Sequence, residues 1–181
     1  MKILSKEGAG MFEYIKSDLS RLVEPTITNF IKYYFFPQGT MFRFQVWFRI
    51  MQFVKLNRLL RIFLCPFIYI IYRHYEYKYG IHINSNIPVG KGLCLIHGDG
   101  VFLNVRSIGE NVTIAQNVTC GVWGGVPTIG NNVTIYVGAV ILGEVLLDDG
   151  CVVGAMSLVR QNVEKNTTVA GIPAKIINRN V

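Results

Sequence analysis

Residues 129–159 read IGNNVTIYVGAVILGEVLLDDGCVVGAMSLV, and this stretch decides the fold of the second part of the chain. An aliphatic residue returns every six positions, and a small or β-branched residue stands four places after each. The aliphatic positions are Ile129, Ile135, Ile141, Leu147, Val153 and Val159. A period of six is neither that of a helix nor that of a simple strand. It predicts short strands joined by corners, three to a triangular coil, stacked as a parallel β-helix.

The same step of six extends toward the N-terminus in two earlier runs, which an insertion and a glycine-rich loop interrupt. These runs are Phe102, Ile108, Ile114 and Cys120, and before them Ile81, Ile87 and Leu93. Coils stacked about 4.8 Å apart, about four or five of them, predict a prism roughly 20 Å tall with open strand edges at both ends.

Composition divides the 181-residue chain near residue 80, although its formal net charge of +7 conceals the division. Residues 1–80 hold 12 Lys and Arg against 5 Asp and Glu, whereas residues 81–181 hold 6 of each. The 51% hydrophobic content suffices for a buried core and excludes a disordered charged protein. We predict a helical, basic and aromatic region over 1–79, a β-helix over 80–177 and a tail over 178–181.

The basic region favours helices and leaves two interpretations open. Residues 30–78 interleave basic and aromatic residues around a single acid, Glu76, and the spacing from Arg43 to Lys55 predicts a helix. The most apolar stretch, residues 62–72, is too short to span a bilayer, which takes about 20 residues. The region either caps the open end of the β-helix or lies on an anionic membrane surface. A nucleic-acid partner is disfavoured because no recognition motif accompanies the charge.

Location in the cell follows from the N-terminus and the cysteines. Residues 1–14 lack a continuous apolar segment of the kind found in signal peptides, and the four cysteines form no CxxC pair. We therefore expect reduced thiols and a cytoplasmic protein, either free or peripheral on the inner face of a bacterial plasma membrane.

The hexads, together with the closing VAGIPAKII of residues 169–177, resemble the hexapeptide-repeat acyltransferases. The resemblance implies a left-handed parallel β-helix, a homotrimer with active sites at its subunit boundaries, and acetyl-CoA as co-substrate with no metal. With two histidines in the repeat, a three-histidine zinc site within one chain is not expected.

One histidine interrupts the repeat. In the hexad starting at Leu93, the small inward position is His97, where imidazole has little room unless the backbone opens outward at Gly98 and Gly100. Serine acetyltransferases and their sugar-modifying relatives have a similar histidine after a Gly-Lys-Gly run, which here is residues 90–92. The resemblance implies that His97 is the general base of acetyl transfer. The alternative is a hydrogen-bonded core histidine.

The resemblance also implies an acid fifteen residues before this base, but the residue there is His82. Either His82 orients His97, or Asp99 or Glu110 does so, and Asp99 is also a candidate contact for the substrate.

For the coenzyme, the resemblance implies a slot between neighbouring β-helices. It places Gly121 and Val122 near the thioester and, along the pantetheine arm, Val137, Gly138, Ala155 and Met156. Lys175 and Arg160 are candidates for the coenzyme phosphates. Trp123 either covers the thioester, stacks on a sugar ring or seals a trimer contact.

The acceptor is predicted from what is missing. The loop that holds serine in serine acetyltransferases ends in Arg-His-Pro, of which only Pro127 is present, and Ile96 replaces the acid before the base. We therefore predict an O-acetyltransferase acting on a sugar hydroxyl, free or lipid-linked, for capsule, exopolysaccharide or lipopolysaccharide. The alternatives are a serine O-acetyltransferase and, from another class, a non-catalytic β-helical scaffold or membrane-surface interaction protein.

Overall fold

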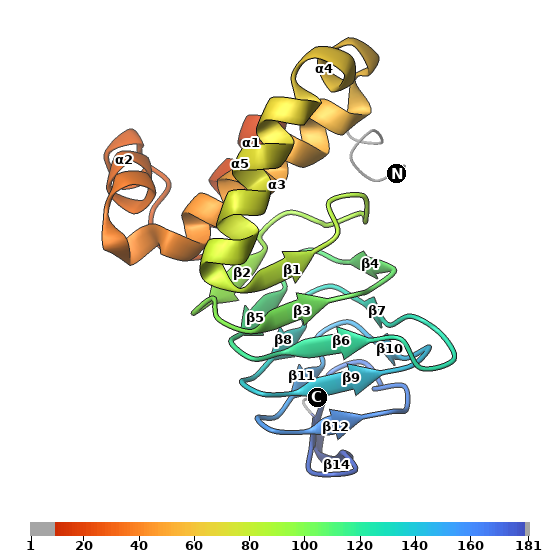
Figure 1. The fold of residues 1–181 in the computed structure, drawn as a ribbon. Helices are drawn as coiled ribbons and strands as arrows, with labels where there is room; N and C mark the ends of the chain where they lie inside the picture. The colour runs from red at the N-terminus through yellow and green to blue at the C-terminus, as the bar shows by residue number, and fades with distance from the viewer. Residues whose placement is uncertain (1–9, 180–181) are drawn as a thin grey trace.

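Residues 10–179 are described by a computed structural model, in which a bundle of helices sits on one end of a parallel β-helix (Figure 1). The helices are α1 (Met11–Ser20), α2 (Ile27–Phe35), the 3-10 helix η1 (Pro37–Gly39), α3 (Thr40–Leu56), α4 (Arg58–Phe63) and α5 (Cys65–Tyr79). Among the described residues, no helix is both long enough and apolar enough to cross a membrane.

Local signals in the sequence place several of the helix ends. The Thr26 hydroxyl accepts a hydrogen bond from the Asn29 N–H at the start of α2, and the Asn57 side chain accepts from two N–H groups at the start of α4. Pro66 stands in the first turn of α5, where its missing N–H costs nothing. Gly80 ends α5 in the left-handed conformation and leads directly into the first strand.

The β-helix has three faces, each a sheet of stacked strands. The first sheet consists of β1 (Ile81–Ile83), β3 (Val101–Leu103), β6 (Thr119–Gly121), β9 (Val140–Leu142) and β12 (Leu158–Val159). The second sheet consists of β4 (Ser107–Ile108), β7 (Thr128–Ile129) and β10 (Leu146–Leu147). The third sheet consists of β2 (Cys94–Ile96), β5 (Thr113–Ala115), β8 (Thr134–Ile135), β11 (Val152–Val153), β13 (Thr167–Ala170) and β14 (Lys175–Arg179).

The strand pairs confirm the predicted parallel β-helix. Within residues 10–179, all pairs between coils are parallel, and only β13 and β14 pair antiparallel. The aliphatic positions from Ile129 to Val159 and the small positions that follow them are all buried. Because β14 runs to Arg179, residues 178 and 179 are strand and not the tail that we expected; residues 180–181 lie outside the described range.

The sequence of the β-helix contains four Asn-x-Thr triplets, and the corners of the coils explain their asparagines. Asn111, Asn117, Asn132 and Asn166 all have φ between 53° and 57°, the left-handed region that Asn tolerates better than most residues. Each of them turns the chain at a corner, and the residue that follows points into the core, as Val112 and Val118 do.

The phase predicted for the first coil was wrong by two residues. Parallel register aligns Ile83 with Leu103, and Leu103 with Cys120, so the large inward residues of the first coil are Ile83, Val89 and Leu95. The error in the first coil has a physical reason: residues two apart on a strand face the same side, so the pairs Ile81 with Ile83 and Leu93 with Leu95 fit either phase. In the second coil the prediction was wrong by one residue, because Phe102, predicted inward, is 47% exposed and Leu103 is buried in its place.

The helices cap the open end of the β-helix and share its core, which was the first of the two interpretations of the basic region. Phe44, Phe48 and Met51 of α3 and Tyr72 and Tyr79 of α5 belong to the same buried cluster as the inward residues of the coils. Among the residues described, then, one apolar core runs from the bundle to the last coil.

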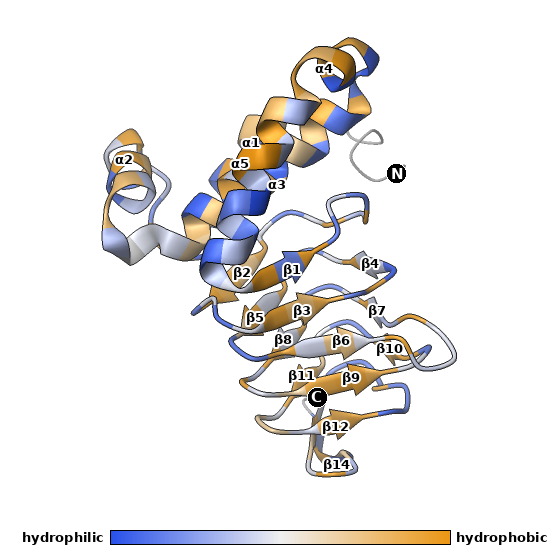
Figure 2. Ribbon diagram, viewed as in Figure 1, coloured by the Kyte–Doolittle hydropathy of each residue, from blue (hydrophilic) through white to orange (hydrophobic). Residues whose placement is uncertain are grey.

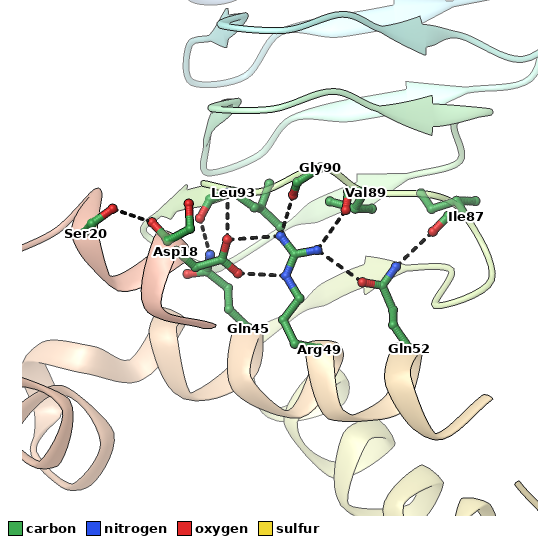
Figure 3. A network of polar contacts seen from close by, with 10 residues as sticks. Asp18, Ser20, Gln45, Arg49, Gln52, Ile87, Val89, Gly90 and Leu93 are labelled. Carbon is green, nitrogen blue, oxygen red and sulfur yellow. Dashed lines mark hydrogen bonds and ion pairs between the residues drawn. The ribbon is translucent and has the colours of Figure 1, made fainter. Parts of the chain in front are cut away.

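A polar stripe on α3 satisfies backbone groups at the edge of the first coil (Figure 3). Gln45, Arg49 and Gln52 lie on one face of the helix, and all three are buried. The Gln45 amide donates to the Leu93 carbonyl, and the Gln52 amide donates to the Ile87 carbonyl at 2.9 Å. A coil without a neighbour above it leaves such groups unpaired, and α3 supplies the donors.

Arg49 is the centre of this contact. Its guanidinium donates to the Val89 carbonyl at 2.9 Å and to the Gly90 carbonyl at 2.6 Å, and it forms a bidentate pair with Asp18 of α1 at 2.8 and 3.0 Å. The Asp18 carboxylate also accepts the Leu93 N–H at 2.9 Å. Asp18 and Arg49 are 1% and 2% exposed. Two helices and the first coil therefore meet at one buried ion pair.

Replacing Arg49 with alanine removes these donors and leaves Asp18 buried without its cation. We expect Arg49→Ala to lower the free energy of unfolding by about 3 to 5 kcal/mol. Urea unfolding followed by circular dichroism measures this. As a control, Arg106→Ala removes an exposed ion pair with Glu144, and we expect it to cost less than about 1 kcal/mol. Equal effects of the two changes would contradict the role given to Arg49.

The pH dependence of this variant tests the same pair from the Asp18 side. Burial raises the pKa of Asp18, and Arg49 acts in the opposite direction. Without Arg49 the folded variant keeps a proton on Asp18 over a wider pH range than the unfolded chain does. Its stability is then fully present below the unfolded pKa of about 4 and falls as the pH rises toward the folded pKa. We expect the loss caused by Arg49→Ala to be smaller at about pH 4.5 than at about pH 8. A loss independent of pH would contradict this.

Candidate active site

His97 lies where the chain passes from the third sheet to the first, between β2 and β3. The turns from β5 to β6, from β8 to β9 and from β11 to β12 stack along the same edge of the prism. We call the edge formed by these four turns the His97 corner.

Strand register shows a two-residue insertion in the turn from β2 to β3, which carries His97. Ile96 pairs with Ala115, and Phe102 pairs with Thr119. Five residues lie between Ile96 and Phe102, whereas three lie between Ala115 and Thr119. The prediction that His97 fills the small inward position was wrong: Val101 is buried there, and His97 is exposed. The insertion carries the imidazole out of the coil, as the predicted outward opening of the backbone allows.

The backbone at His97 adopts a conformation that few side chains favour. His97 has a φ of 56°, and among the described residues it shares the left-handed region with asparagines, glycines and Met156. Met156, also with a φ of 56°, lies at the same corner, between β11 and β12. Residues held in such conformations cost energy and occur often at functional sites.

The helical cap supports the insertion from behind. Gly98 is buried, and a Cβ atom built there would lie 2.6 Å from the Met41 Sδ atom and 3.1 Å from the Tyr79 carbonyl oxygen. A side chain at this position would therefore have to move the end of the Met41 side chain, and it would lie tightly against the Tyr79 carbonyl. The cap thus packs closely against the turn that carries His97.

Four of the predicted coenzyme residues lie at the His97 corner as well. Val137 and Gly138 follow β8, and Ala155 and Met156 follow β11 one coil further on. The Met156 N–H donates to the Val137 carbonyl at 2.9 Å, and the Met156 side chain lies so close to Gly138 that a Cβ atom there would overlap it. Asp99 is exposed in the His97 turn, and its carbonyl accepts the Asn117 N–H at 3.0 Å.

The predicted residues Gly121, Val122 and Trp123 lie at the opposite edge of the first sheet. Gly121 ends β6, and Val122 and Trp123 follow it, about 10 Å from the His97 corner as a three-residue strand measures. Trp123 is 65% exposed, with the Arg160 guanidinium carbon 5.1 Å from its ring centroid. Arg160 and Lys175 line one cavity of about 500 Å³. One chain therefore divides the predicted site between two corners.

His82 points outward from β1 and faces the helical cap. Its Nδ1 atom lies 3.9 Å from the Glu76 Oε1 atom, and its ring is 5.9 Å from the ring of Phe102. Both His82 and Glu76 line a cavity of about 410 Å³ between α5 and the first two coils. The acid beside His82 is thus Glu76, which sequence reasoning missed, although it is the one acid of residues 30–78. Glu110 follows β4 at another corner, so it does not take the orienting role.

The remaining reactive groups do not gather into a second site. Among the described residues, no three side chains of the His, Cys, Asp and Glu types are grouped so as to hold a metal ion. Burial raises the pKa of Cys120 and of Cys151 to about 12, so both thiols stay protonated in the core.

Comparison with known proteins agrees with the β-helical fold. The family model described as Bacterial transferase hexapeptide (six repeats) matches residues 127–161. Over 106 residues, the chain is 42% identical to a serine acetyltransferase of Staphylococcus epidermidis and 41% identical to one of Staphylococcus aureus. The β-helix is thus similar to hexapeptide-repeat transferases and to serine acetyltransferases. These alignments cover 55% of this chain, and the chain spans about half the length of the relatives.

Solved serine acetyltransferases share the fold over more of the chain. The enzyme of Brucella abortus in complex with coenzyme A is 25% identical with a TM-score of 0.75, covering 93% of this chain and 68% of that one. The enzyme of Neisseria gonorrhoeae has a TM-score of 0.77 at 24% identity, covering 97% of this chain and 69% of that one, which shows the fold alone. The helical cap thus belongs to the shared architecture.

Proposed function

We propose that this chain is an acetyl-CoA-dependent O-acetyltransferase with His97 as its general base. The observation that carries the proposal is the two-residue insertion that places an exposed imidazole at the corner where Val137, Gly138, Ala155 and Met156 also lie. The hexapeptide repeats, the serine acetyltransferase relatives and the coenzyme A complex of one structural relative support it.

The proposed reaction is a direct transfer. His97 takes the proton from the acceptor hydroxyl while that oxygen attacks the carbonyl carbon of the thioester. The C–S bond breaks, an ester forms, and the proton passes from the imidazolium to the leaving thiolate of coenzyme A. Histidine suits both steps because its ordinary pKa of about 6.5 lets it gain and lose a proton near neutral pH.

Bound acetyl-CoA belongs between two chains in this proposal. Residues Gly121 to Trp123 lie at the opposite corner from His97, so one chain cannot bring both sets to a single thioester. A homotrimer would place the Trp123 corner of one subunit beside the His97 corner of the next. Arg160 and Lys175 would then meet the coenzyme phosphates.

Serine is the first candidate for the acceptor. The curated relatives are serine acetyltransferases, so the comparisons favour the serine alternative over the sugar acceptor that the sequence predicted. One observation keeps a sugar hydroxyl as the second candidate. The loop after β6 carries an exposed Trp123 beside Arg160, and Val126 precedes Pro127, where the resemblance implies an arginine and a histidine for serine.

Release of coenzyme A thiol from acetyl-CoA tests both the reaction and the acceptor. We expect thiol release with serine, or else with a nucleotide sugar or lipid-linked saccharide. His97→Asn should lower kcat by about 10² to 10⁴-fold, since general-base catalysis contributes that much. The melting temperature should stay unchanged, because His97 is exposed. His74→Asn, on the exposed side of α5, is the matched control and should keep full activity.

Three outcomes of this assay would contradict the proposal or part of it. Full activity in His97→Asn would show that His97 is not the general base. Absence of thiol release with every acceptor, together with absence of an acetyl-CoA-induced thermal shift, favours a non-catalytic scaffold. Activity with saccharides and none with serine overturns the first candidate for the acceptor and leaves the transfer mechanism standing.

A further inference from the structure

The hairpin formed by α4 and α5 presents large apolar side chains that the described part of the chain leaves uncovered. We call Leu59, Ile62, Phe63, Phe67 and Ile70 the hairpin surface; each is between 59% and 69% exposed. All six residues of α4 escape burial, and the helix packs only along α3 and α5 among the principal contacts. Figure 2 shows the apolar colouring of α4 at the end of the bundle away from the coils. Exposed apolar surface of this extent marks an interaction site.

Basic residues, and no acids, accompany the hairpin surface. Arg58 and Arg61 lie within α4 and are exposed. The sequence from Pro25 to Tyr75 contains no Asp or Glu. The surface therefore combines apolar side chains with arginines that form no ion pair among the described residues, and this combination fits a partner that is both apolar and anionic.

We propose that the hairpin surface docks on an anionic phospholipid membrane, with α4 and the first turn of α5 lying in the headgroup region. Such a helix inserts its apolar side chains at the acyl boundary while its arginines stay at the level of the phosphates. The contact is interfacial and does not span the bilayer, in keeping with helices of 6 and 15 residues.

A second copy of the chain fits this surface less well. A two-fold contact brings the same patch of each copy face to face, so Arg58 and Arg61 would meet their own counterparts. The hairpin surface offers no carboxylate to pair with them, because the one acid of the hairpin, Glu76, is buried near the other end of α5. Like charges opposed in a desolvated contact disfavour that arrangement, whereas phosphate headgroups supply the missing anions.

Co-sedimentation of the full chain with lipid vesicles tests the proposal. We expect binding to vesicles with about 30% phosphatidylglycerol, weaker binding to pure phosphatidylcholine, and release as the salt rises from about 0.1 to about 0.5 M. Arg58→Glu with Arg61→Glu should weaken partitioning at least about tenfold, and Phe63→Gln with Phe67→Gln should weaken it on both vesicle types.

Matched controls come from the β-helix. Ile177→Gln and Arg106→Glu alter an exposed apolar residue and an exposed arginine of the β-helix, and vesicle binding should stay as in the unchanged chain. Because none of the hairpin residues has a place in the proposed chemistry, thiol release with a soluble acceptor should also stay unchanged in the hairpin variants. Vesicle binding can therefore fail while the proposed transferase activity stands.

Two outcomes would overturn the membrane proposal. One is binding that the hairpin variants leave intact. The other is absence of vesicle binding combined with concentration-dependent self-association in analytical ultracentrifugation that Phe63→Gln with Phe67→Gln abolishes, which would assign the surface to a second copy of the chain.

Discussion

The structure depends on how the open end of the β-helix is closed. A stack of parallel coils leaves backbone groups of its first coil without partners. Three side chains on one face of α3, Gln45, Arg49 and Gln52, donate hydrogen bonds to carbonyls of that coil. Arg49 makes the largest number of these contacts. Its guanidinium donates to two carbonyls of the first coil and also forms the ion pair with Asp18 of α1. Because the ion pair is buried, loss of either partner would leave an unpaired charge in the interior and would destabilise the contact between the helices and the first coil.

The same cap determines where the proposed chemistry takes place. Gly98 fits against Met41 and Tyr79, so the turn that carries His97 rests on α3 and α5. His82 meets Glu76 of α5 across the junction of bundle and coil. The helical region is therefore part of the scaffold of the candidate site. Among the described residues of this region, Arg49 is the one buried cation, and the other Lys and Arg side chains are exposed or half-buried.

The sequence predicts the coils because period six, unlike the helix or strand period, has a single structural meaning over residues 129–159. It does not fix the phase of the first coil, because Ile81 and Ile83 are both aliphatic and face the same side of their strand. The sequence indicates an insertion before Phe102, but its length of two residues and its position at His97 and Gly98 became visible only in the register of β2 and β3. The role of Arg49 has no local signal in the sequence, because its partners other than Gln52 lie 31, 40 and 41 residues away. Glu76 was present as a lone acid, but its contact with His82 depends on how α5 meets β1.

The central claim is that one imidazole, exposed by an insertion in the first coil, faces a thioester bound between two chains. A crystal structure of the full chain with coenzyme A tests it most directly. The account predicts that the coenzyme sulfur lies within reach of His97 of one subunit, directly or through one water, and beside Gly121 and Val122 of its neighbour. Coenzyme A bound away from the His97 corner, or held by a single chain, would contradict it.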